Sequence, residues 1–474
     1  MNRAISVGVA HVMIAAGCAL ILSSCGTEVG RASTRPLLSV PDSWQQQRTK
    51  NTPLDTSALS TWWTRFNDPV LDELVASALR SSPDVNSALS RIAEYRARRG
   101  TERSRLFPSL DANVSGGRTR DTIRENHLTT SNQSYAASLD ASWQVDLFGR
   151  QRQSLAAASA DLAQIEEDYY GSQVSLAADV ASAYLNLRSA EAQLLVVQRS
   201  LETRSETAQL TQWREQAGTG DALDTQRSLA ALDLARASIP SLQLTIAQTR
   251  NQLALLSGAT PGSLDPLLAP PRDVPLGPPD LAMGIPAEML RQRPDVRAAE
   301  RGLEAAFART RAAQRARLPA LNLRGSIGVE ALTAGRLYNP TSTVISILGE
   351  LTAPIFDAGR IRQTITIQRE LEQQSLNTYD STVLIALGEV ENALVAVQNN
   401  TERLTLLSRA AAAAGQAAVL STLQYQSGQV DLLVSLDAQR TLLDLEQQVV
   451  TTTANRASAY VQLYQALGGG WTGR

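Results

Sequence analysis

Long runs of the sequence carry apolar residues at alternating steps of four and three positions. Between residues 150 and 216 the chain has no proline and a single glycine, Gly171. A 4-3 spacing is the heptad pattern of a helix that packs along other helices. At about 1.5 Å per residue this helix is a rod roughly 100 Å long, far longer than an ordinary globular helix. The heptad positions are Leu176, Val180, Ala183, Leu187, Ala190, Leu194, Val197 and Leu201.

The rod occurs twice. A second long helix is expected at about residues 360–426, with the same heptad phase and one polar break at Asn400. Proline and glycine landmarks repeat in the same order with a shift of about 210 residues, which indicates one fold built from two copies of a half. The paired landmarks are Pro83-Asp84-Val85 and Pro294-Asp295-Val296, Pro108 and Pro319, Gly149-Arg150 and Gly359-Arg360, Gly218 and Gly428, and Gly258 and Gly468.

Between the helices of each half, the apolar period changes from helical to two. Leu110, Ala112 and Val114 alternate with polar residues, and a longer alternation follows a polar loop. Period two predicts strands with one apolar face. We therefore expect antiparallel strands at about 108–118 and 134–148, and in the second half at about 319–330 and 342–356.

These strands are candidates for crossing a membrane. No segment beyond the N-terminal region is apolar enough to span as a helix, whereas strands of about ten residues span in a closed barrel. A half-buried soluble sheet has the same alternation, so the pattern leaves both readings open. Four strands cannot close, because the smallest membrane barrels have about eight. A membrane sheet therefore predicts an oligomer whose chains share one barrel.

Each long helix is followed by a short turn and a returning helix. Gly218 and Gly428 end the long helices, and Asp221 and Asp431 place a negative charge at the start of the returning ones. Pro240 predicts a kink or an interruption of the first returning helix.

The N-terminus has the features of an export signal. A basic residue precedes an apolar run, and both cysteines of the chain lie in this region. Leu22-Ser23-Ser24-Cys25 has the form that is cleaved and lipidated in bacterial lipoproteins, so Cys25 is expected to carry a lipid anchor. An uncleaved membrane helix is the alternative reading, and Cys18 is a second candidate for lipidation.

These patterns predict the organisation of the whole chain. The segment between the halves holds eight prolines, which predicts a stiff, extended connector. The expected parts are a signal peptide (1–24), an extended leader (25–58), a first repeat (59–260), the connector (261–286) and a second repeat (287–474).

Composition and motifs give no indication of catalysis. The net charge of −2 offers no electrostatic basis for binding nucleic acid. Of the two histidines, His11 lies in the signal and His127 in a loop between expected strands. Neither a metal-binding cysteine pair nor a phosphate loop is present in the sequence. We expect no enzyme, no metal site and no cofactor other than the N-terminal lipid.

One charged pair has a possible functional role. Asp437 and Arg440 stand at i and i+3 on one face of the second returning helix. As an exposed ion pair they would contribute less than about 1 kcal/mol. In an oligomer with its turns around an axis, the same residues would form charged rings that select and gate permeants. The sequence by itself favours the simple ion pair.

Together these features resemble the TolC-like outer-membrane factors of bacterial tripartite export systems, most closely the NodT-type lipoproteins. The resemblance covers about residues 60–472. Its specific pieces are Trp62-Trp63, Asp68-Pro69 with Leu71, the paired Pro108 and Pro319, Leu436-Asp437-Ala438-Gln439-Arg440, and the ending Leu463-Tyr464-Gln465-Ala466-Leu467-Gly468-Gly469-Gly470-Trp471.

The resemblance implies a mainly α fold with a membrane portion. Three identical chains would share an outer-membrane β-barrel of about twelve strands, continued by a barrel of helical hairpins as a periplasmic tunnel. A belt around the tunnel would come from the Trp62 region, the connector and the C-terminus. The chain would be a passive conduit that is anchored by its lipid in the bacterial outer membrane and opened at its periplasmic tip by partners.

The resemblance also assigns roles at the tip. Asp437 and Arg440 would form the charged constriction, and Val434 stands where some relatives have a second acidic residue. Hairpins of a periplasmic adaptor would dock at the turns, contacting Gly218 and Asp221, and Gly428 and Asp431. The second partner would be an inner-membrane pump of the RND type.

Two other classes of protein remain as alternatives. A lipid-anchored periplasmic coiled-coil scaffold, with a small soluble sheet and no pore, would share the heptads and the anchor. The adaptor protein itself would need compact β-rich modules on either side of its helical hairpin, and the sequence has no pattern for them.

Overall fold

A computed structural model describes residue 44 and residues 59–123, 128–277, 290–337 and 339–471. Residues 40–474 form one compact unit. The expected signal peptide, Cys25, most of the leader and the last part of the connector lie outside the described residues. Among the helices that are described, none is both long and apolar enough to cross a membrane.

Two copies of one half account for most of the described chain. The corresponding helices have identical lengths of 22, 67 and 35 residues. Equal lengths are expected of a duplicated half and confirm the internal duplication. The first copy comprises α4 (Pro83–Ser104), β1 (Ser109–Ile123), β2 (Leu128–Val145), α5 (Arg150–Gln216) and α6 (Ala222–Leu256); the second comprises α9 (Pro294–Arg315), β3 (Ala320–Ala331), β4 (Thr343–Thr352), α10 (Arg360–Gln426) and α11 (Leu432–Ala466).

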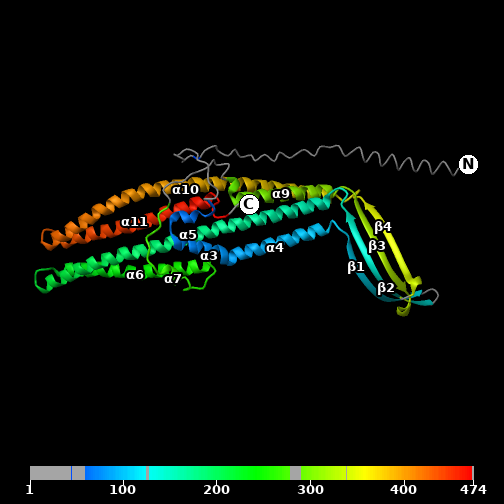
Figure 1. Cartoon of the computed structure of the whole chain (residues 1–474), viewed down its shortest axis with the longest axis horizontal. Helices are drawn as coiled ribbons and strands as arrows, with labels where there is room; N and C mark the ends of the chain where they lie inside the picture. Colours follow the sequence, from blue (N-terminus) through cyan, green and yellow to red (C-terminus); the bar gives the residue numbers. More distant parts are fainter. Residues whose placement is uncertain (1–43, 45–58, 124–127, 278–289, 338, 472–474) are drawn as a thin grey trace. The chain divides into compact units, whose positions relative to one another are not determined.

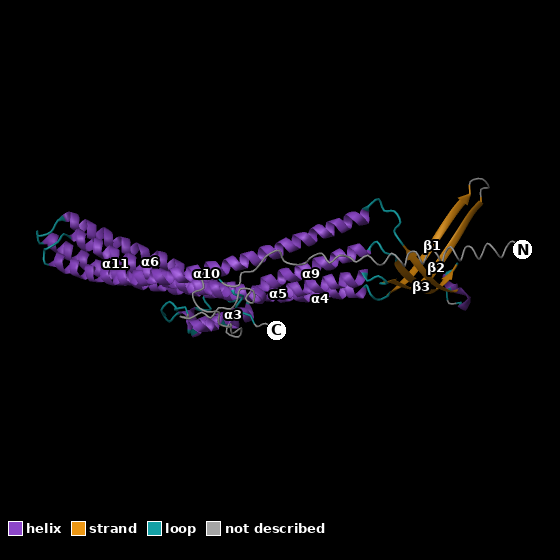
Figure 2. Ribbon diagram, turned by 90° about the horizontal axis from the view of Figure 1, so that it is seen from above, coloured by secondary structure: helices purple, strands orange, loops and turns teal. Residues whose placement is uncertain are grey.

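The helices form two long antiparallel hairpins. Hairpin 1 is α5 with α6, and hairpin 2 is α10 with α11 (Figure 1). Helices α4 and α9 continue the bundle on the sheet side, where both pack against α5. Figure 2 shows the helices running from the two turns at one end of this unit to the strands at the other. The fold class expected from the heptads is therefore confirmed.

The two long helices have the same length but are buried to different degrees. Helix α5 buries 23 residues, including six of its eight heptad positions, whereas α10 buries eight. The difference arises because α5 contacts both halves as well as α3 (Pro69–Ser81). Several large apolar side chains of α10 remain exposed, namely Leu384, Ile385, Leu406, Val419, Leu420 and Leu423.

The four strands form one antiparallel sheet in the order β1-β2-β3-β4. The β-hairpin formed by β1 and β2 is longer than the sequence predicted, because backbone pairing continues through polar residues to Ile123 opposite Leu128. The expectation that β1 ends near residue 118 was wrong, since a backbone ladder does not require apolar side chains. Strand β4 ends at Thr352, earlier than the expected residue 356, and Pro354 lacks the N–H that a longer ladder needs.

The expected interruption of the helix at Pro240 is also wrong. Helix α6 runs continuously from Ala222 to Leu256 with Pro240 inside it. The Pro240 side chain is exposed, so water can solvate the carbonyl group one turn earlier that loses its helical partner. A proline on a solvent face is therefore tolerated here.

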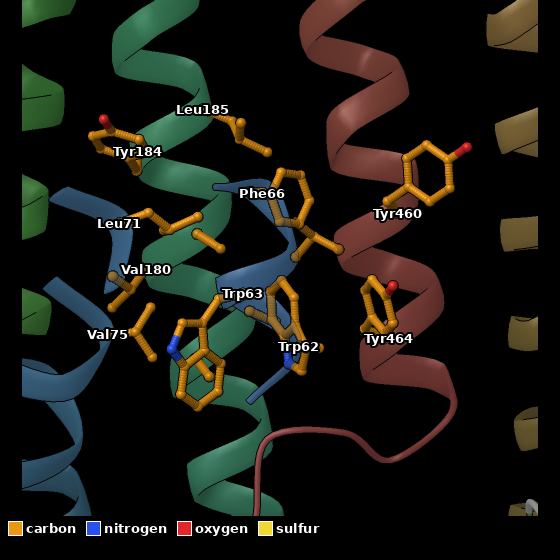
Figure 3. Close-up of a cluster of buried hydrophobic side chains, with 14 of the residues drawn as sticks. Trp62, Trp63, Phe66, Leu71, Val75, Val180, Tyr184, Leu185, Tyr460 and Tyr464 are labelled. Atoms are coloured by element: carbon orange, nitrogen blue, oxygen red, sulfur yellow. The ribbon is translucent and has the colours of Figure 1, made fainter. Parts of the chain in front are cut away.

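A belt of shorter elements packs around the middle of the bundle. It consists of η1 (Trp62–Phe66), α3, α7 (Asp265–Leu268) and the C-terminal residues after α11. The fully buried Trp62 stacks on Tyr464 with ring centroids 5.3 Å apart. Figure 3 shows the two rings next to each other. The Gly470 N–H donates to the Leu59 carbonyl at 3.0 Å. The segment around Trp62 therefore packs against the C-terminal segment.

A buried arginine fastens the connector to α5. Arg188 of α5 has no exposed surface, and its Nη1 donates to Glu191 Oε2 at 2.6 Å and to the Pro270 carbonyl at 3.2 Å. Burial alone would lower the pKa of Arg188, but contacts with Tyr184 and Glu191 outweigh it and raise the pKa. The guanidinium therefore stays charged at a buried site that joins α5 to the proline-rich segment.

Candidate functional site

The two turns that end the hairpins, with the helix ends beside them, form the tip of the described unit. Gly218 and Gly428 have φ of 73° and 74°, the left-handed conformation that ends a helix and disfavours side chains. An added Cβ would meet nothing within 4 Å at either position, so backbone conformation is the reason for glycine. The turn glycines expected from the sequence are thus placed where the long helices stop.

The two aspartates after the glycines differ. Asp221 caps α6, because its Oδ1 accepts from the Leu223 N–H at 3.0 Å. Asp431 also occupies the N-cap position, of α11, but makes no side-chain capping bond there. Both carboxylates are exposed, so both remain available at the surface of the tip.

A single arginine joins the two hairpins at the tip. Arg214, in the last turn of α5, donates from Nη2 to the Gln426 carbonyl at 2.8 Å and from Nη1 to the Tyr425 carbonyl at 3.4 Å. Its guanidinium also lies 4.7 Å from the centroid of the Tyr425 ring. A cation at the end of α10 compensates the partial negative charge of the last carbonyls. Arg214 was not predicted from the sequence, where the available signal was a basic residue four positions before the turn glycine.

Replacing Arg214 by alanine is expected to loosen the end of α10. A hydrogen bond to a charged group contributes about 1.5–3 kcal/mol, so amide exchange near Gln426 should accelerate about tenfold or more. Hydrogen–deuterium exchange of this segment, with the start of α10 as internal reference, measures the effect. Arg236→Ala, which removes an exposed arginine paired with Asp233 on α6, is the matched control. Equal exchange in both variants would contradict a link through Arg214.

Asp437 and Arg440 lie on the exposed face of α11. Arg440 Nη2 donates to Asp437 Oδ1 at 2.9 Å, and the two side chains are 70% and 62% exposed for Arg440 and Asp437 respectively. Within one chain this is a surface ion pair, worth about 0–1 kcal/mol. Val434 is exposed one turn earlier on the same helix. The expected pair exists, with its charges directed to solvent and not into the bundle.

Gln439, between these two residues, points the other way and was missed from the sequence. It is buried, and its Nε2 donates to Thr207 Oγ1 of α5 at 3.3 Å and to Thr422 Oγ1 of α10 at 3.4 Å. Its Oε1 is buried without a hydrogen-bond partner among the described residues. A polar residue on the buried face of α11, four positions after Ser435, was the signal that could have identified it.

Small hydroxyl side chains line the contact between helices near the tip. Thr211 and Ser228 hydroxyl oxygens lie 2.7 Å apart inside hairpin 1, and Thr422 and Ser435 lie 3.2 Å apart inside hairpin 2. We call Thr207, Thr211, Ser228, Thr422 and Ser435 the hydroxyl seam. Polar contacts therefore contribute to the packing of the tip, next to buried apolar residues such as Leu432.

The described residues contain no group of three or more His, Cys, Asp or Glu side chains that could hold a metal ion. What the tip offers instead is an exposed charged pair, two glycine turns and a polar contact between hairpins. Such features suit a mobile constriction or a docking end better than bond-making chemistry.

The described chain thus combines two paired helical hairpins, each joined to two strands of one open four-stranded sheet. The chain belongs to the outer membrane efflux protein family, whose family model matches residues 74–259 and 285–469. The two matched segments correspond to the two halves of the fold.

Individual relatives agree with this assignment. The chain is 31% identical to outer membrane protein OprJ of Pseudomonas aeruginosa, over 98% of this chain and 96% of OprJ. It is 32% identical to the toluene efflux pump outer membrane protein TtgF of Pseudomonas putida, over 86% of this chain and 85% of TtgF.

Solved structures show the same architecture. The outer-membrane channel OprN matches with a TM-score of 0.83 at 32% identity, over 91% of this chain and 99% of OprN. The open state of the MtrE outer-membrane channel of Neisseria gonorrhoeae matches with a TM-score of 0.78 at 30% identity, over 92% of this chain and 97% of MtrE. The protein is thus an outer-membrane efflux channel component and not an enzyme, as the sequence predicted.

Proposed function

We propose that three copies of this chain form a passive conduit across the bacterial outer membrane, closed at rest by the tip and opened by partner proteins. The observation that carries an oligomer is the open sheet, and the number three follows the resemblance to the TolC-like factors. Within the described residues, β1 pairs only with β2 and β4 only with β3, which leaves two free edges. Free strand edges in a membrane are unstable, so closure by strands of further copies follows.

The exposed face of α10 supports the same assembly. Its large apolar side chains, among them Leu384 and Leu420, have no cover from the described part of the chain. Contiguous exposed apolar residues on a helix mark a surface that packs against another protein. Equivalent hairpins of neighbouring copies would cover α10 and complete a closed helical tunnel.

The names of the relatives support an assignment of partners. TtgF and its counterparts are outer-membrane proteins of efflux pumps, and the present chain would work in a tripartite assembly with a periplasmic adaptor and an inner-membrane pump of the RND type. Adaptor hairpins would contact the turns at Gly218, Asp221, Gly428 and Asp431, which are exposed. In the trimer, Asp437 and Arg440 would face the axis and form the gate.

Size and conductance test the proposal. Protein purified from outer membranes should migrate as a heat-resistant trimer and give small, discrete conductance steps in a planar bilayer. A helical protein that stays monomeric, and that is silent even after deletion of the turn at Gly428, would instead be a scaffold without a pore.

Cys25 is proposed as the site of the N-terminal lipid, which would anchor the protein to the membrane. Replacement of Cys25 by serine is expected to abolish metabolic labelling of the protein with radioactive palmitate, because serine has no thiol to which the lipid group can be attached. Cys18→Ser is the matched control and should keep full labelling. Labelling that persists in Cys25→Ser and disappears in Cys18→Ser would move the anchor to Cys18.

A further inference from the structure

The four places where strands meet helices share an unusual surface. At each of them, large apolar side chains are exposed next to the sheet. Phe356 is 88% exposed and Ile355 is 98% exposed, although neither lies in a strand. We call the segments 98–108, 146–152, 309–319 and 355–362 the junction segments. Their exposed apolar residues are Phe107, Leu147, Phe148, Leu318, Ile355 and Phe356.

The junction segments also concentrate positive charge. They contain twelve arginines and three acidic residues, a formal surplus of nine positive charges. The whole chain, by contrast, has a net charge of −2. A surplus of this size in four short segments is a strongly cationic patch.

Most of these arginines lack an anionic partner in the chain. Arg98, Arg105, Arg152 and Arg309 form ion pairs, and Arg315 donates to the Gly149 carbonyl at 2.7 Å. The side chains of the other seven make neither an ion pair nor a hydrogen bond with any described residue. These seven are Arg99, Arg103, Arg150, Arg311, Arg317, Arg360 and Arg362, all exposed.

The position of two of these arginines is electrostatically unfavourable. Arg150 and Arg360 are the first residues of α5 and α10, and neither helix has an acidic residue in its first turn. The partial positive charge of a helix N-terminus repels a cation. Asp146 and Asp357 accept from backbone N–H groups at these ends, but each is the one acidic residue of a junction segment that holds two arginines. An external anion would neutralise part of the remaining positive charge of the junction segments.

The junction segments meet at one end of the sheet. Neighbouring strands are paired close to this end, Ser109 with Ser142 and Ala320 with Thr352. Trp143 Nε1 donates to the Leu106 carbonyl at 3.1 Å, which holds the first junction segment against β2, the strand that leads into the second. Figure 1 shows α4, α5, α9 and α10 all reaching this end of the strands.

We propose that the junction segments bind anionic phospholipid headgroups at the periplasmic face of the outer membrane. This assignment rests on the proposed function, which places the strands in the membrane and the helices in the periplasm. Exposed apolar residues then sit at the depth of the acyl boundary, and the arginines reach the phosphates just below. Arginine suits this role because its planar donors bind phosphate in pairs.

Native mass spectrometry of the purified full-length mature protein tests the proposal. The probes are phosphatidylglycerol, phosphatidylcholine and inorganic phosphate. The junction variant carries Arg103→Gln, Arg317→Gln and Arg360→Gln. The matched control carries Arg199→Gln, Arg403→Gln and Arg409→Gln, which removes three exposed, unpaired arginines about 60 Å or more along α5 and α10 from the junctions.

Wild type and control should retain phosphatidylglycerol in preference to phosphatidylcholine. The junction variant should bind phosphatidylglycerol at least about tenfold more weakly, since each basic residue at an anionic surface contributes about fivefold. Conductance should not change, because these residues lie outside the tip.

Equal phosphatidylglycerol binding by the junction variant, or no preference over phosphatidylcholine, would overturn the proposal. So would displacement of the lipid by millimolar inorganic phosphate, which would indicate a site for free anions. A junction variant whose trimers dissociate with unchanged lipid per chain would assign the arginines to subunit contacts. A wild-type protein that prefers phosphatidylglycerol but never conducts would contradict the proposed channel and leave the lipid site standing.

Discussion

Alanine at both Asp437 and Arg440 is expected to enlarge the single-channel conductance of the purified protein and to make cells leakier to large antibiotics. In one chain the two side chains form an exposed ion pair at 2.9 Å, so their loss costs the fold about 1 kcal/mol or less. In the proposed trimer, the same charges would stand in rings across the opening. Their removal would widen the opening and take away the charges that repel or hold ions there.

The matched control is the exposed i, i+3 pair Asp233 and Arg236, which also lies on a returning helix. Asp233→Ala with Arg236→Ala should leave conductance and antibiotic permeability unchanged. Single variants separate the two charges: Asp437→Ala should shift selectivity towards anions and Arg440→Ala towards cations. Unchanged conductance in the double variant would return Asp437 and Arg440 to the role of a surface ion pair.

Replacing Arg188 by methionine is expected to destabilise the protein by about 3–5 kcal/mol, as removal of one partner of a buried ion pair does. Methionine fills most of the space but leaves the Leu268 and Pro270 carbonyls without the donor that holds the connector. Glu191 keeps Arg250 at 2.9 Å, so part of its charge remains compensated. Thermal unfolding followed by the helical circular dichroism signal measures the change.

Arg199→Met on the same helix is the control for Arg188. Arg199 is exposed and lacks an ion pair in the described structure, so its loss should change stability by about 0.5 kcal/mol or less. Arg188→Lys keeps the charge but cannot reach two carbonyls and Glu191 at once, and should fall between the two. A midpoint for Arg188→Met equal to that of Arg199→Met would show that the connector is held by its prolines alone.

Much of this fold could be predicted because its signals are long and occur twice. A heptad pattern over 67 residues predicts a helix even where single residues favour another conformation. Gly218 and Gly428 each indicated a turn, and the agreement between the two halves supported both predictions. Strand ends were less predictable, since β1 continues through polar residues whose pairing depends on the partner strand. Pro240 did not mark a helix end. The free-energy cost of a proline in a helix depends on whether water reaches the unpaired carbonyl, and that exposure is set by the tertiary structure.

The candidate site was predicted only in part. Asp437 and Arg440 were recognisable by spacing, whereas Arg214 and Gln439 act across the two hairpins. Arg214 contacts carbonyls more than 200 positions away in the sequence, and backbone carbonyls carry no sequence signal. Gln439 is one polar residue on a buried face, and its value depends on Thr207 lying opposite. Contacts between the two halves of the chain depend on how the hairpins pack, which the periodic sequence pattern does not specify.

The hydroxyl seam has a thermodynamic consequence for any opening of the tip. Thr207, Ser228 and Thr422 also donate to carbonyls of their own helices, at 2.8–2.9 Å. When the helices on either side of the seam move apart, within a hairpin or between the two, these hydroxyls keep a partner and meet water, so the seam exposes little hydrocarbon. Heat capacity changes follow the apolar area exposed, so opening should proceed with little change in heat capacity. The free-energy difference between the closed and open tips should then vary nearly linearly with temperature. Both states should therefore stay accessible over the temperatures at which a bacterium grows.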